Sequence, residues 1–163
     1  MANASAMCTS FKKELLQGFH VFDSATIVSR TSLTTPTKDT FKGALILATG
    51  SAGAASTNYS SVSASEVGTS GSYTTAVGGI AITNVDGQVV TSSTSGVWTP
   101  SASWTTGPGF TSSGSFDCLF IHNSSQGNKA VSVHVFTAQS ITVGTFTLTM
   151  PTNDSSTALL RLA

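Results

Sequence analysis

The sequence contains very little charge. It has seven Lys and Arg residues and seven Asp and Glu residues, so only 9% of the chain is charged and the formal net charge is zero. Soluble domains usually carry about 25% charged residues. A chain without a basic face cannot neutralise nucleic-acid phosphates, and it lacks the polybasic clusters that bind anionic membranes. We therefore expect neither nucleic acid nor a membrane as a partner.

Cysteine and long apolar runs are also scarce. The two cysteines, Cys8 and Cys118, lie far apart without a framework of spacings, and such residues usually serve as small buried hydrophobic side chains. No apolar stretch approaches the ~20 residues of a membrane-spanning helix. The first ten residues lack the basic and apolar regions of a secretory signal. We expect a protein that is made and folded in a cytosol without disulfides.

The chain is instead rich in hydroxyl groups, because Ser and Thr together form about a third of its 163 residues. Interleaved Val, Ile, Leu, Phe and Trp supply the apolar surface that a disordered tail lacks, and Thr suits a pleated strand. About eight short strands separated by turn signals predict a single all-β domain over residues 1–163. A β-sandwich of the jelly-roll or the immunoglobulin-like type fits this pattern, and the spacing does not distinguish the two.

One short amphipathic helix is expected near the N-terminus, over residues 8–22. Apolar side chains recur there every three or four positions. Thr9 or Ser10 can cap its first turn, and Gly18 disfavours helix near its end. The residues expected on its outer face are Lys12, Lys13 and Glu14, and those expected on its apolar face are Cys8, Phe11, Leu15, Leu16, Phe19 and Phe22.

Several signals follow along the chain. Residues 41–48 form a continuous apolar run and predict a central strand, whereas residues 50–72 predict a long loop of small residues, which in a compact domain is either mobile or functional. The pair Asp86-Gly87 predicts a β-hairpin. Trp98 and Trp104 are expected to anchor a crossing between sheets.

The densest group of potentially reactive residues lies in a predicted hairpin over residues 116–136, which contains Asp117, Cys118, His122 and His134. Residues two apart on a strand share a face, so Cys118 and His122 share one. They lie about 13 Å apart at ~3.3 Å per residue, too far to bind the same zinc ion. The register that sets the valines of the return strand beside Cys118 puts His134 on the opposite face. We expect a structural hairpin with Cys118 in the core and both histidines on the sheet surface.

Motifs for catalysis and cofactor binding are missing as well. No G-x-S-x-G elbow occurs, the Gly-containing loops lack the lysine of a P-loop, and the acidic residues are scattered singly rather than paired. We expect no enzymatic activity, no cofactor and no metal.

Four segments carry information through their co-occurrence and order: CTSFKKELLQGFHVF, DTFKGALILA, IHNSSQGNKAVSVHVF and FTLTMPTNDSSTALLRLA. Together they resemble a family of small structural proteins of tailed bacteriophages, the capsid decoration or cement proteins encoded among the head genes. The resemblance covers both ends of the chain and the hairpin region but not residues 50–110. It implies a β-sandwich that sits on the outside of the capsid, often as a trimer.

This resemblance implies a virion structural protein whose partners are the major capsid protein and further copies of the chain, in a homotrimer. Chain termini are free to reach neighbouring subunits. The residues predicted to contact the capsid or another subunit are therefore Lys12, Lys13, Leu160, Arg161 and Leu162.

Two alternative functions stay open at this point. The first is a phage tail or fibre component. The second is a carbohydrate-binding module that uses Trp98 and Trp104 together with the loops of Tyr59 and Tyr73.

Overall fold

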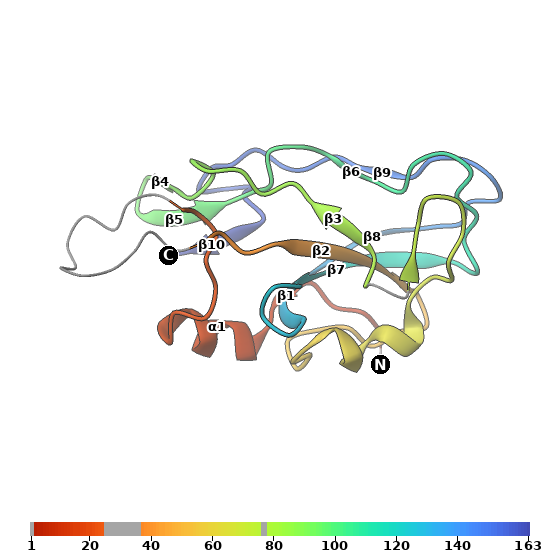
Figure 1. Ribbon diagram of the computed structural model, residues 1–163, viewed down its shortest axis with the longest axis horizontal. Coiled ribbons are helices and arrows are strands. Elements are labelled where there is room, and N and C mark those ends of the chain that lie inside the picture. The colour runs from red at the N-terminus through yellow and green to blue at the C-terminus, as the bar shows by residue number, and fades with distance from the viewer. Residues whose placement is uncertain (1, 25–36, 76–77) are drawn as a thin grey trace.

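A computed structural model describes residues 2–24, 37–75 and 78–163, and these form three antiparallel sheets and one short α-helix (Figure 1). The largest sheet has the strand order β1-β8-β7-β2-β3, which are Ala6–Met7, Lys129–Gln139, Phe116–Asn123, Phe41–Leu47 and Ile80–Ile82. A three-stranded sheet has the order β10-β5-β4, which are Leu160–Leu162, Ser95–Trp98 and Val90–Ser92. The third sheet pairs β6, Trp104–Thr105, with β9, Thr147–Leu148. The predicted β-rich class with one N-terminal helix is confirmed.

The core lies on both faces of the five-stranded sheet. In Figure 1 the helix and two 3₁₀ turns lie on one side of this sheet, and β6 and β9 lie on the other. The interior strands β2 and β7 are buried along almost their whole length, which explains their continuous apolar sequences, since strands covered on both faces do not alternate. The prediction of an interior strand at residues 41–48 is confirmed.

The helix α1 (Thr9–Leu16) is shorter than the predicted 8–22. Gly18 ends it with a φ of 73°, as the sequence indicated. The predicted caps are wrong, because Cys8 occupies the N-cap position and no side chain caps the first turn. None of the helices among the described residues is long and apolar enough to cross a membrane.

The burial of some side chains in and after α1 also differs from the prediction. Glu14 is buried rather than on the outer face, whereas Leu16 and Phe19 are 92% and 44% exposed rather than in the apolar stripe. The early end of the helix is the reason, since the irregular segment after Gly18 brings His20 to Glu14. Lys12 and Lys13 are exposed, as predicted.

The β7–β8 hairpin has the register that the valine pattern predicted. Cys118 lies opposite Val135 and Phe120 opposite Val133, whereas His134 pairs with Leu119 and so belongs to the other face. Cys118 is fully buried, as expected.

The placement of His122 on the sheet surface is wrong, because this side chain is fully buried. The ring of Tyr59 stacks on it with centroids 5.1 Å apart, and its Nε2 lies 2.8 Å from the carbonyl oxygen of Gly78. The hairpin alone would leave His122 on the surface, but segments from elsewhere in the chain cover this face of the sheet.

The expected hairpin at Asp86-Gly87 is also wrong. The pair forms a turn with a positive φ at Gly87, but the flanking strands β3 and β4 belong to different sheets. The tight hairpin lies instead between β4 and β5, where Ser93 adopts a φ of 55° without a Gly, Asn or Asp to signal it. The crossing between sheets is confirmed at the two tryptophans, since Trp98 ends β5 and Trp104 begins β6.

Residues 50–72, the predicted loop, contain the two 3₁₀ turns η1 (Tyr59–Ser61) and η2 (Ser63–Ser65). The loop is fixed to β2 by Glu66, whose buried carboxylate accepts hydrogen bonds from the phenols of Tyr59 and Tyr73. Tyr73 Oη in turn accepts a bond of 2.8 Å from the backbone N–H of Leu45. Burial raises the pKa of Glu66, and the two tyrosine hydrogen bonds oppose that rise.

The substitution Tyr73→Phe tests this attachment. It leaves the buried N–H of Leu45 without an acceptor and removes a donor from Glu66, so we expect the free energy of unfolding to fall by about 1–3 kcal/mol in urea denaturation. Tyr59→Phe is the matched control, because it also removes a phenol from Glu66 but orphans no main-chain donor. An equal or larger loss in Tyr59→Phe would contradict the role given to Tyr73.

Candidate functional site

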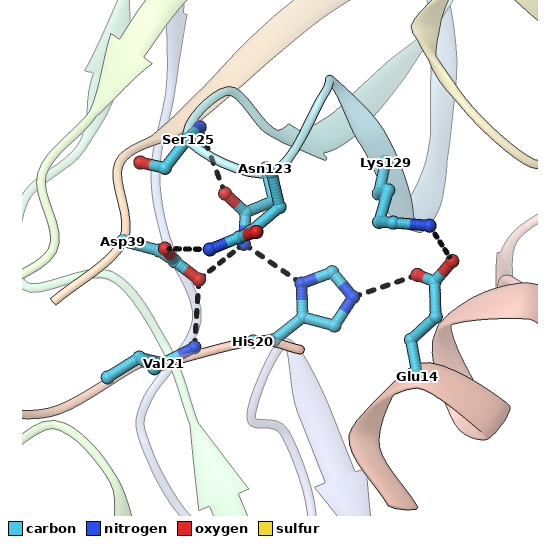
Figure 2. Close-up of polar contacts among 8 residues, drawn as sticks. Glu14, His20, Val21, Asp39, Asn123, Ser125 and Lys129 are labelled. Carbon is cyan, nitrogen blue, oxygen red and sulfur yellow. Dashed lines mark hydrogen bonds and ion pairs between the residues drawn. The ribbon is translucent and has the colours of Figure 1, made fainter. Parts of the chain in front are cut away.

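A buried polar network joins α1 and the segment after it to the large sheet (Figure 2). Its centre is the side-chain amide of Asn123, at the end of β7. Asn123 Oδ1 accepts a 3.1 Å bond from the backbone N–H of Ser125. Its Nδ2 donates to Asp39 Oδ2 at 2.7 Å and to His20 Nδ1 at 2.9 Å. The carboxylate of Asp39 requires a donor at this position, which fixes the orientation of the amide.

The same contacts determine the tautomer of His20. Because Nδ1 accepts from Asn123, the ring proton resides on Nε2, which donates to Glu14 Oε2 at 2.9 Å. The other carboxylate oxygen of Glu14 accepts a 2.6 Å bond from Lys129 Nζ. The His20 side chain has no exposed surface. An acid–histidine pair of this kind is familiar from catalytic sites, and here both ring nitrogens bond to side chains of the protein, Glu14 and Asn123.

Asp39 extends the network to the chain that follows the helix. Its Oδ2 also accepts a 2.8 Å bond from the backbone N–H of Val21, and its Oδ1 accepts from Gln126 Nε2 at 3.1 Å. One residue further on, the ring of Phe22 stacks on that of Phe41 with centroids 4.6 Å apart. The network therefore holds residues 20–22 against the beginning of β2.

An apolar groove of about 560 Å³ lies beside this segment. We call it the α1–β10 groove, because α1 and β10 contribute to its walls. Its apolar lining includes Phe11, Leu15, Phe22, Trp98, Leu160 and Leu162. Leu162 is 54% exposed, so the groove is open to solvent at the C-terminal strand. In Figure 1 the C-terminus and α1 lie at the same end of the molecule.

The structure brings some of the predicted contact residues together and separates others. Leu160 and Leu162 both line the α1–β10 groove. Arg161 does not, because its guanidinium donates to the carbonyl oxygens of Ser155 and Ser156. Lys12 and Lys13 are exposed on α1 but do not line the groove, and Lys13 lines a second cleft on another side of the helix.

The sequence did not reveal the polar network or the groove. Glu14, His20, Asp39 and Asn123 come from four separate segments. The available signal was modest: Asp39 lies just before one apolar strand and Asn123 ends another, and a buried polar side chain at such a position must find a partner.

The metal-binding residue types of the hairpin are not gathered into a metal site within the described part of the chain. Among residues 2–24, 37–75 and 78–163, no three or more His, Cys, Asp or Glu side chains are grouped so that they could hold a metal ion. Burial raises the pKa of Cys8 to about 11 and that of Cys118 to about 12. Both thiols are therefore protonated at neutral pH, and the thiolate that reacts or binds metal is not formed.

The two tryptophans are each only 3% exposed. Trp98 Nε1 donates to Asn84 Oδ1 and Trp104 Nε1 to the carbonyl oxygen of Ile80, both at 3.2 Å. Tyr73 is fully buried. These rings offer no open face on which a sugar could stack.

No protein-family model matches this chain, and neither the curated proteins nor the solved structures contain a match to it.

The substitution Glu14→Gln tests the network through its pH dependence. Burial alone would raise the pKa of Glu14, but hydrogen bonds from Lys129 and His20 and the charge of Lys129 lower it below the ordinary value of 4.5. A lowered folded-state pKa contributes stability above pH 4.5, and this contribution is lost as the pH falls through the folded-state value. We expect the variant to be less stable by about 2 kcal/mol at pH 7.

The difference between wild type and Glu14→Gln should shrink at pH 3, as measured by urea denaturation at both pH values. A difference that is the same at pH 7 and pH 3 would show that the charge of Glu14 does not stabilise the fold.

Proposed function

We propose that this chain is a non-enzymatic virion structural protein that binds the outer surface of an assembled phage head and stabilises it. Its partners in this proposal are the major capsid protein and further copies of itself, in a homotrimer, and its sheets form a β-sandwich of the jelly-roll or immunoglobulin-like type. The supporting observation is the α1–β10 groove, an apolar surface that includes Leu160 and Leu162 of the predicted contact segments.

The mechanism is stabilisation linked to binding. A protein that associates only with the assembled lattice raises the free energy needed to disrupt that lattice. In this proposal apolar side chains of the major capsid protein enter the α1–β10 groove, and Lys12, Lys13 and Arg161 contact its polar surroundings. Burial of apolar area contributes roughly 25 cal/mol per Å². A net charge of zero keeps repulsion low between neighbouring copies on the lattice.

The substitution Leu162→Asp tests the role of the groove. Leu162 is 54% exposed, so the fold should tolerate the change, whereas a carboxylate would have to be desolvated against an apolar partner. We expect binding to heads that lack the chain to weaken about tenfold or more in cosedimentation, which corresponds to about 1.4 kcal/mol.

Val143→Asp is the matched control, since this valine is 76% exposed and does not line the groove. The control should bind heads like the wild type. Equal binding by Leu162→Asp and Val143→Asp would remove the groove from the proposed interface.

A further inference from the structure

A second cleft lies on the other side of α1 and differs from the groove in its chemistry. It has a volume of about 540 Å³, within the ~300–1,000 Å³ of ligand pockets. Three segments form it: α1 with the residues that follow it as far as Phe19, residues 57–58 just before η1, and the β7–β8 turn with the first residue of β8. We call it the polar cleft, and its lining includes Ser10, Gln17, Phe19, Asn58, Gln126 and Lys129.

The charges in the polar cleft largely cancel. Lys129 Nζ lies 2.6 Å from Glu14 Oε1 (Figure 2), and this ion pair leaves Lys13 as the other charged residue in the lining. A site for phosphate or for a metal cation needs a concentration of one sign, which the polar cleft does not provide. A purely apolar ligand is disfavoured too, because most of the lining residues carry polar groups.

The amides of the polar cleft have hydrogen-bonding capacity left over. Asn58 uses its Oδ1 to accept from Ser60 and Ser61, and its Nδ2 has no partner within the described part of the chain. Gln126 uses its Nε2 to donate to Asp39, which leaves its Oε1 as an acceptor. The hydroxyl of Ser10 is buried and has no hydrogen-bond partner among the described residues, a state that costs free energy until a partner is supplied.

The polar cleft also holds an exposed aromatic ring. Phe19 is 44% exposed, and Lys129 Nζ lies 5.2 Å from its ring centroid. The ring offers an apolar surface beside uncharged donors and acceptors, whereas both tryptophans are buried.

We propose that the polar cleft binds an uncharged carbohydrate. The C–H face of a sugar ring packs on Phe19, while its hydroxyl groups, which both donate and accept, bond with Gln17, Asn58 and Gln126. A sugar hydroxyl also serves as partner for Ser10 after a rotation about χ1. This binding does not depend on the proposed attachment to the phage head, because the polar cleft and the α1–β10 groove involve different faces of α1.

The test begins with a glycan array probed with the labelled wild-type chain, followed by titration calorimetry with the free neutral sugar that gives the strongest signal. We expect Phe19→Ala to weaken the affinity at least tenfold and Gln17→Ala to weaken it severalfold. Val143→Ala is the control, because it shortens an exposed apolar side chain outside the polar cleft, and its affinity should equal that of the wild type.

Two results would overturn the proposal: an array without any signal for the wild type, or an unchanged affinity in Phe19→Ala. If circular dichroism shows that Phe19→Ala does not fold, the binding site is located instead from changes in the amide chemical shifts of the wild type during a titration with the sugar. Shifts centred on Gln17, Phe19 and Gln126 support the polar cleft, and shifts confined to other parts of the chain contradict it.

Discussion

The arrangement of the N-terminal segment depends on one side-chain amide, that of Asn123. It accepts from the hairpin turn at Ser125 and donates to Asp39 and His20, and through them it joins β7, the beginning of β2 and the chain after α1. Asn123, Asp39 and His20 are buried, and a buried polar group that loses its partner costs about 1–3 kcal/mol. A small polar side chain therefore fixes segments that are more than eighty residues apart in sequence.

The helix has little stability of its own. It has only eight residues and no side-chain cap, and isolated helices below ~12–15 residues are marginal in water. Its position relies on the burial of Phe11 and on the bonds that Glu14 accepts from His20 and Lys129. Because one face of α1 lines the apolar groove and another lines the polar cleft, the same network supports both proposed binding surfaces.

The sequence predicted those structural features that depend on residues close together in the chain. The alternation of valines and aromatic residues gave the β7–β8 register, and Gly18 marked the end of the helix. The burial of Glu14 and His122 could not be predicted in this way, because it follows from segments that fold over them from elsewhere in the chain. The turn at Ser93 has a positive φ without the Gly, Asn or Asp that usually signals one.

The proposed attachment to a phage head is tested most directly by the copy number of the chain in purified virus particles, measured by quantitative mass spectrometry against the major capsid protein. A protein bound across a symmetric head lattice should be present at on the order of hundreds of copies per particle. A dozen copies or fewer would instead indicate a tail or fibre component, and absence from the particle would contradict a structural role in the virion altogether.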